Sequence, residues 1–227
     1  LNEYRVPPAA LPRDGARQQV RLLTEGDATA VHALYQHLLP QKPGMMAKEE
    51  KEITRLLSSD TMHGAGFFAG DRLLGYLLCK FRRADPENWL INDIVVRELL
   101  YADASALHGL LAFLQTQADQ IERIHFHSFD DELHLLFDDV RDGSDTLIPS
   151  VYHQSNRQGV GLMYRVIDLP GLLAALPERK GMETVPGGVQ LTLQDSFYPR
   201  NGGSWVVGWG DGRPRILPET RADVALT

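Results

Sequence analysis

The sequence predicts an α/β fold, because the spacing of its apolar residues changes from element to element in a regular order. The predicted order is one strand, two helices, three strands, a helix, a strand and a helix, after which the pattern starts again. The chain has 227 residues, of which 43% are hydrophobic, so it can bury a sizeable core. This length is compatible with one or two domains, and we expect two.

The first elements are expected between residues 17 and 57. Residues 1–16 are Pro-rich and are interpreted as a linker or tail. A strand is predicted over 20–23, followed by a helix that Asp27 can cap by accepting from its first amides. The apolar face of this helix contains Val31, Leu34, Tyr35 and Leu38. A second helix is predicted over 47–57, and its charge run KEEKE indicates a solvated side.

The next segment predicts three strands and another helix. Residues 65–82 form two apolar runs with turn residues at 70–72, which is typical of a hairpin. A third strand is predicted over 89–99, and Asp103 can then cap a helix. The buried stripe of this helix would contain Leu107, Leu110, Leu111 and Leu114. A strand over 123–129 and a short helix within 130–139 complete the first region.

The stretch 141–158 is polar and turn-rich, which indicates a linker or domain boundary. We therefore expect one domain over 17–150 and another region over 151–227. In the second region, strands are predicted over 161–169, over 188–195 and twice over 202–217. A short helix is predicted from Pro170, whose missing amide has no cost in a first turn. The Gly-rich PRNGGSW is interpreted as a hairpin turn.

Charge and cysteine content narrow the class of protein. The formal net charge of -7 argues against a nucleic-acid or anionic-membrane surface. The single cysteine, Cys79, excludes an internal disulfide and favours a cytoplasmic location. The sequence contains no apolar run near the roughly 20 residues of a membrane span and no signal peptide. Because the chain begins with Leu1, we interpret it as a piece of a longer polypeptide.

Two histidines on one predicted strand raise the question of a metal site. His125 and His127 would share a face, and His134 or Asp130 could supply a third ligand. Alternation with Ile124 and Phe126 already explains the pair as solvent-facing polar residues, and we favour that interpretation. We expect no metal ligand in this chain.

Other catalytic motifs are missing from the sequence. It contains no GxSxG, GxGxxG or GxxxxGK[ST], and Cys79 lies in the middle of a predicted strand. The best ionisable candidates are Asp93 and Glu98, because a carboxylate on a central strand needs a partner. The alternative is a structural ion pair with Arg97 or with a residue of a neighbouring strand.

The order of elements resembles the GNAT acetyltransferase fold, in which the fourth strand and third helix flank the pyrophosphate of coenzyme A. Family members carry an RxxGxG/A turn there. The corresponding residues 99–106, LLYADASA, contain neither glycine nor arginine, and Asp103 would place a negative charge where the family binds an anion. The resemblance therefore implies a GNAT-like mixed sheet flanked by helices in which no acetyl-CoA is bound.

A more specific likeness covers nearly everything from Val20 onward. It includes ELLYADASALHGLLAFLQTQADQIERI, DDELHLLFDD, MYRVIDLPGLLAAL and LTLQDSFYPRNGGSW, in that order. These segments are similar to Eis-like ("enhanced intracellular survival") acetyltransferases, which have a catalytic GNAT domain, a degenerate GNAT-like domain and a sterol-carrier-like domain. The likeness implies that 17–150 is the degenerate domain and that 151–227 is an incomplete sterol-carrier-like α/β region. The catalytic domain would precede Leu1, and no catalytic residue is carried over.

Three functions follow as hypotheses. The first is a non-catalytic portion of an Eis-like, acetyl-CoA-dependent N-acetyltransferase, partnered by the catalytic domain or by other subunits of an oligomer. Its acceptor would be a cationic or neutral amine, such as an aminoglycoside or a lysine side chain. The second is a stand-alone module that binds an apolar small molecule, and the third is a structural assembly piece. Residues expected to line a pocket in the second region are Met163, Leu172, Leu173, Phe197 and Trp205.

Overall fold

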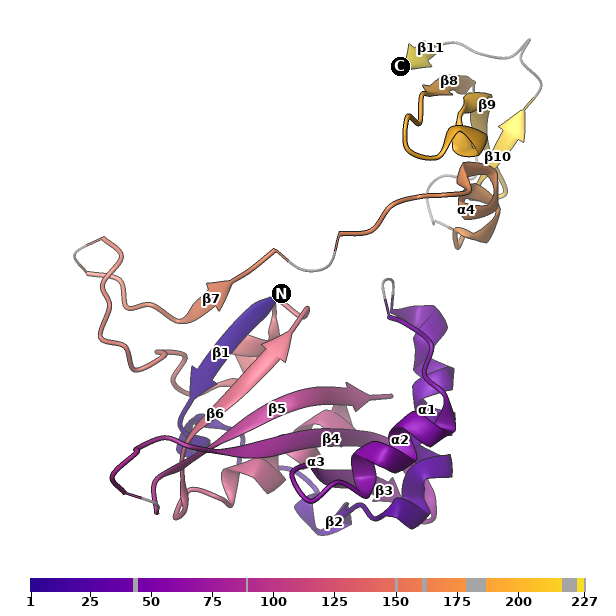
Figure 1. Cartoon of the computed structure of the whole chain (residues 1–227). Helices are drawn as coiled ribbons and strands as arrows, with labels where there is room; N and C mark the ends of the chain where they lie inside the picture. The colour runs from indigo at the N-terminus through magenta and orange to yellow at the C-terminus, as the bar shows by residue number, and fades with distance from the viewer. Residues whose placement is uncertain are drawn as a thin grey trace. The chain divides into compact units, whose positions relative to one another are not determined.

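The computed structural model describes residues 1–42, 45–88, 90–149, 151–160, 163–178, 187–217 and 224–226. The chain divides into two compact units, Leu1–Gly161 (unit 1) and Leu162–Thr227 (unit 2) (Figure 1). Each unit contains its own β-sheet, one with seven strands and one with four.

Unit 1 is built on a mixed sheet, as the sequence predicts. The strand order is β2-β3-β4-β5-β6-β1-β7. Adjacent strands are antiparallel except for β5 and β6, which are parallel. The strands are β1 (Asn2–Val6), β2 (Val20–Leu22), β3 (His63–Ala69), β4 (Arg72–Arg83), β5 (Asn92–Tyr101), β6 (Ile121–Ser128) and β7 (Asn156–Gln158).

Helices cover both faces of this sheet. The α-helices are α1 (Ala28–Leu38), α2 (Glu50–Leu57) and α3 (Ala104–Gln115). Leu77 of β4 packs in the same buried cluster as α3, whereas Leu78 packs in a second cluster with α1 and α2. Because successive strand residues point to opposite faces, the two clusters lie on opposite sides of the sheet. The predicted arrangement of a sheet flanked by helices is confirmed.

The expectation that residues 1–16 are a linker or tail is wrong for their first part. β1 pairs with β6 and β7, and Figure 1 shows the indigo β1 beside the pink β6. Tyr4 and Val6 are buried in the α3 cluster, with 2% and 0% of their area exposed. The alternation of apolar and charged residues in NEYRV is a strand pattern, and the prolines that follow obscured it. β7 similarly lies inside the stretch interpreted as a linker.

Unit 1 also contains short 3₁₀ segments, and two of them, η3 and η5, bear on predictions made from the sequence. These segments are η1 (Pro8–Ala10), η2 (Arg17–Gln19), η3 (Glu25–Asp27), η4 (Leu39–Gln41) and η5 (Leu133–Leu136). The short helix predicted within 130–139 is η5. Asp27 does not cap α1 as predicted: its carboxylate accepts from the Thr24 amide at 2.8 Å and belongs to a capping box that begins one turn earlier.

Unit 2 has the strand order β10-β9-β8-β11. Its elements are α4 (Leu169–Ala175), β8 (Gly188–Leu193), η6 (Pro199–Asn201), β9 (Gly203–Gly210), β10 (Arg213–Leu217) and β11 (Val224–Leu226). The predicted helix at Pro170 and the strands of β8, β9 and β10 are confirmed. The β9–β10 turn has positive φ angles at Asp211 and Gly212, 52° and 73°, as a tight hairpin requires.

The strand predicted over 161–169 is wrong for residues 163–168, which are not in a strand. The Asn201 side chain bonds to this segment instead. Its Nδ2 donates to the Val166 carbonyl at 2.8 Å, and its Oδ1 accepts from the Leu169 amide at 3.2 Å. A side chain therefore satisfies backbone groups that a neighbouring strand would otherwise pair.

Candidate functional site

The end of β5 and the start of α3 correspond to the turn that the sequence singles out. The parallel register of β5 with β6 ends at Val96–Phe126, whereas its antiparallel register with β4 continues to Tyr101. Leu78 lies opposite Glu98 and Cys79 lies opposite Val96, so Arg97 is the extra residue of a β-bulge. A bulge bends its strand and increases the local twist. Here it lies where the pairing with β6 ends.

The first turn of α3 is closed by a carboxylate. Asp103 has an extended backbone, with φ -150°, and its Oδ1 accepts from the Ala106 amide at 2.8 Å. The Ala102 amide is also bonded, to the Leu74 carbonyl of β4 at 2.8 Å. The predicted Asp103 cap is therefore confirmed. Free amides at a helix N-terminus attract anions, and here the anion is a side chain of the protein.

A second carboxylate bridges the ends of β5 and β6. The Tyr101 hydroxyl donates to Asp130 Oδ2 at 3.3 Å, and Lys42 Nζ lies 5.5 Å from the centre of the Tyr101 ring. Burial, and after it the charge of Asp130, raises the pKa of Tyr101. The hydroxyl is therefore a neutral donor at physiological pH. It fixes the last residue of β5 to the loop after β6.

Glu98 is held by a residue of the neighbouring strand β4 and by a residue of the segment before α2. Its carboxylate accepts from the Tyr76 hydroxyl and forms an ion pair with Lys48, whose Nζ lies 4.7 Å from the Tyr35 ring centre. Burial raises the pKa of Tyr76 well above its usual value, and the charge of Glu98 adds to the effect. The ionic partner of Glu98 therefore comes from the segment before α2. It is not Arg97, which was one of the two partners suggested from the sequence.

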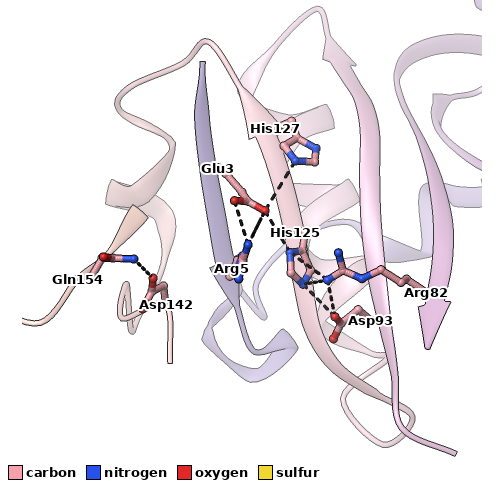
Figure 2. Close-up of polar contacts among 8 residues, drawn as sticks. All are labelled: Glu3, Arg5, Arg82, Asp93, His125, His127, Asp142 and Gln154. Atoms are coloured by element: carbon pink, nitrogen blue, oxygen red, sulfur yellow. Dashed lines mark hydrogen bonds and ion pairs between the residues drawn. The ribbon is translucent and has the colours of Figure 1, made fainter. Parts of the chain in front are cut away.

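Asp93 belongs to a separate polar network (Figure 2). Its Oδ2 lies 2.7 Å from Arg82 Nη2 and 3.0 Å from His125 Nε2. The residue is 6% exposed, and its ionic partner Arg82 lies on the neighbouring strand β4. The structural alternative of an ion pair with a neighbouring strand is therefore confirmed for Asp93. Asp93 and Glu98 have different partners, and the structure does not bring them together as an acid and a base.

His125 and His127 differ in exposure. The shared face is confirmed, but His125 is only 3% exposed, so the interpretation of both as solvent-facing is wrong for this residue. Arg82 and residues of β1 cover it, and the sequence of β6 alone could not show this. His134 instead stacks on Tyr4, at 6.3 Å between ring centres. Within the described ranges, no three His, Cys, Asp or Glu side chains are placed to hold a metal ion.

The pocket residues expected in unit 2 lie largely at its surface. Met163 and Phe197 are 94% and 80% exposed, and Leu172 is 41% exposed. Leu173 and Trp205 are half-buried. The guanidinium of Arg165 lies 5.2 Å from the centre of the Phe197 ring.

Asp195 was not predicted as an important residue. Its side chain is 1% exposed and accepts from the amides of Phe197 and Tyr198 at 3.0 and 2.7 Å. Asn201 Nδ2 donates to its other oxygen at 3.1 Å, and Arg165 completes the set of donors. The Tyr198 amide is the main cause of the lowered pKa of Asp195. The signal was an aspartate two residues past the end of β8 at Leu193, immediately before the turn residues of SFYPRN.

Comparisons with known proteins place this geometry in a family. A family model described as "Acetyltransferase (GNAT) domain" matches residues 44–166. No curated protein matches the chain. None of the helices within the described residues is long and apolar enough to cross a membrane.

Solved structures give the same fold. A GCN5-related N-acetyltransferase from Anabaena variabilis is 16% identical with a TM-score of 0.71, covering 99% of this chain and 55% of its own. One from Kribbella flavida is 20% identical with a TM-score of 0.66, covering 97% of this chain and 50% of its own. Eis1 from Mycobacterium abscessus is 17% identical with a TM-score of 0.59, covering 96% of this chain and 53% of its own.

This chain therefore spans about half the length of these neighbours. At such low sequence identity, the structural likeness shows the fold alone. The mixed sheet, the parallel β5–β6 pair and the strand-turn-helix of α3 agree with that fold. The family model covers more than half of the 227 residues, and the chain belongs to the GNAT acetyltransferase domain family.

Proposed function

We propose that this chain is the non-catalytic portion of an Eis-like, acetyl-CoA-dependent N-acetyltransferase that acts on primary amines. The observation that carries the proposal is the bond between Asp103 Oδ1 and the Ala106 amide. A diphosphate at the start of α3 would have to compete with Asp103 for the Ala106 amide, which already donates to the Asp103 carboxylate. The negative charges of the diphosphate and of Asp103 would also repel each other. The turn 99–106 also lacks the glycines and the arginine of a coenzyme loop. The residues present do not suit coenzyme A.

In this proposal, unit 1 is a degenerate GNAT-like scaffold for a catalytic GNAT domain supplied by the same polypeptide or by an oligomer partner. Its two central carboxylates support this role, because Asp93 and Glu98 are each held in an ion pair. The greater length of the structural neighbours leaves room for such a domain in a related enzyme.

Unit 2 would be the incomplete sterol-carrier-like region that walls the acceptor pocket. The exposed side chains of Met163 and Phe197, with the half-buried Trp205, are available for contact with an acceptor. The net charge of -7 supports a cationic acceptor, such as an aminoglycoside or a lysine-rich peptide, because opposite charges accelerate encounter. The acceptor itself is held, in this view, between the catalytic domain and unit 2.

Calorimetric titration of the chain with acetyl-CoA tests the proposal. We expect no saturable heat up to millimolar acetyl-CoA, with circular dichroism as the control that the sample is folded. Saturable binding at micromolar acetyl-CoA would show that the chain has its own coenzyme site, and the non-catalytic role would be abandoned.

A second candidate, a stand-alone module for an apolar small molecule, is favoured by the exposed apolar residues of unit 2. Titration with an environment-sensitive apolar dye separates the two functions. Saturable binding that Phe197→Ser weakens at least tenfold would support the module. Binding that Phe197→Ser leaves unchanged would argue against it.

A further inference from the structure

Four strands of unit 1 contribute to one polar cluster around His125 (Figure 2). Ile124 and Phe126 are buried in the α3 cluster, so His125 and His127 point to the opposite side of β6. We call this side, with Glu3, Arg5, Arg82 and Asp93 of the neighbouring strands, the polar face. The contacts that a buried imidazole makes with charged groups depend on whether the ring is protonated.

One ring nitrogen of His125 has two competing partners. Its Nε2 lies 2.8 Å from Arg82 Nη2 and 3.0 Å from Asp93 Oδ2. Arginine can only donate and a carboxylate can only accept, so Nε2 cannot satisfy both at once. The other nitrogen, Nδ1, lies 3.6 Å from Glu3 Oε1. The protonation of His125 therefore decides which partner Nε2 keeps.

We propose that His125 is a proton-operated switch on the polar face. Neutral His125 carries its hydrogen on Nδ1, toward Glu3, and its Nε2 lone pair accepts from Arg82. Acidification adds one proton from solvent to Nε2, which then donates to Asp93. Arg82 then loses the Nε2 lone pair as an acceptor, shares Asp93 Oδ2 with a second donor and faces a new positive charge, so it moves away from His125 toward solvent.

The exposure of the groups shows which of them can move. The side chain of Arg82 is 51% exposed, whereas those of Asp93 and His125 are 9% and 4% exposed. Glu3 is held by Arg5, whose Nη2 lies 3.1 Å from Glu3 Oε1. Arg82 can therefore rotate into water with little loss of packing, while the other members of the cluster stay in place.

The remaining charges around the ring set the pH at which the switch operates. Burial lowers the pKa of His125, and the positive charge of Arg82 lowers it further, while Asp93 acts in the opposite direction and Arg5 adds a smaller lowering. The other titratable neighbour is His127, whose Nε2 lies 3.9 Å from Glu3 Oε1. The switch therefore operates below the ordinary histidine pKa of about 6.5.

The switch does not depend on the proposed acetyltransferase role, because it involves only contacts among β1, β4, β5 and β6. Its product is a released guanidinium beside a charged imidazole, so the polar face becomes more positive on acidification. An acidic partner surface would bind this face more tightly in acid than at neutral pH.

NMR of the intact chain tests the switch, with the imidazole nitrogens of His125 and the guanidinium of Arg82 followed from about pH 8 to about pH 5. We expect the Nδ1–H tautomer at the upper pH, together with slow exchange of the Arg82 guanidinium hydrogens. In acid, both ring nitrogens become protonated, and the Arg82 hydrogens exchange rapidly at the same midpoint. An Nε2–H tautomer at the upper pH, or Arg82 exchange without that midpoint, overturns the proposal.

Two substitutions separate the switch from an ordinary buried histidine. Arg82→Ala removes a positive charge beside the ring and should raise the pKa of His125. Arg82→Gln serves the same purpose if the alanine variant does not fold. His127→Gln is the matched control on the same strand and should leave the His125 midpoint nearly unchanged. A midpoint that neither Arg82 variant moves would show that Arg82 does not act on the imidazole.

Discussion

The two units contain helices that begin in the same way but are buried very differently. α3 and α4 each start with an aspartate that accepts from the amide three residues on, Ala106 at 2.8 Å and Gly171 at 2.9 Å. α3 then buries seven residues against the sheet, whereas no residue of α4 is buried. The comparison shows that capping defines where a helix begins, while tertiary packing decides how much it stabilises the fold.

The stabilising contacts of the units differ accordingly. Unit 1 has two apolar clusters, one on each side of its sheet. Among the described residues of unit 2, the buried apolar side chains are Val206 of β9 and Pro214 of β10. The polar cluster around Asp195 ties the segment before α4 to the turn before β9. We therefore expect unit 1 to depend on apolar packing and unit 2 on that cluster.

The largest effect is expected from truncating the core of α3. Leu110 is 0% exposed, and Leu110→Ala should lower the unfolding free energy of unit 1 by about 2–5 kcal/mol. The matched change in α4, Leu172→Ala, removes a side chain that is 41% exposed and should cost less than about 0.5 kcal/mol. Urea unfolding followed by hydrogen exchange in each unit measures both. Equal losses would mean that the two helices are packed alike.

Asp195→Ala should destabilise unit 2 and leave unit 1 unchanged. The substitution leaves the donors of Asn201, Tyr198 and Phe197 without their shared acceptor. The expected result is a lower thermal midpoint for unit 2 alone, resolved by the exchange of β8 and β9 amides. Glu178→Ala, at an exposed residue of unit 2 outside its helices and strands, is the control. An unchanged thermal midpoint for Asp195→Ala would show that the cluster does not stabilise unit 2.

Removing the two caps gives a smaller contrast. Asp103→Ala should cost unit 1 about 1 kcal/mol and increase exchange at Ala106. Asp168→Ala should increase exchange at Gly171, but it should change the global unfolding of unit 2 less, because α4 buries no residue. A larger global loss from Asp168→Ala than from Asp103→Ala would contradict the comparison.

The smallest effect is a pH dependence of unit 1. The folded state lowers the pKa of His125, so the unfolded chain binds that proton more readily. The stabilising contribution is complete above the ordinary value of about 6.5 and is lost as pH falls through the lower folded value. Urea midpoints measured across this range should decline less for His125→Gln than for the native chain. His127→Gln should decline like the native chain, and an identical decline in all three would refute the linkage.

Local patterns predicted much of this fold. The β3–β4 hairpin, the Asp103 cap and the α3 stripe all follow from residues close together in sequence. β1 was missed because the prolines after its short strand pattern suggested a tail, and because its partner in β6 lies far along the chain, with Asn2 opposite Ser128. The burial of His125 was missed for the same reason, since Arg82 and Glu3 come from other strands. In both cases, contacts between distant segments set the outcome.

The start of α3 gives the most direct test of the proposed non-catalytic role. Acetyl-CoA is added to the ¹⁵N-labelled chain, and the amide signals of Ala104, Ser105 and Ala106 are followed. With the Ala106 amide bonded to Asp103, these signals should stay in place up to millimolar acetyl-CoA. Saturable shifts at these three amides would show that a coenzyme diphosphate binds there, and the central claim would be contradicted.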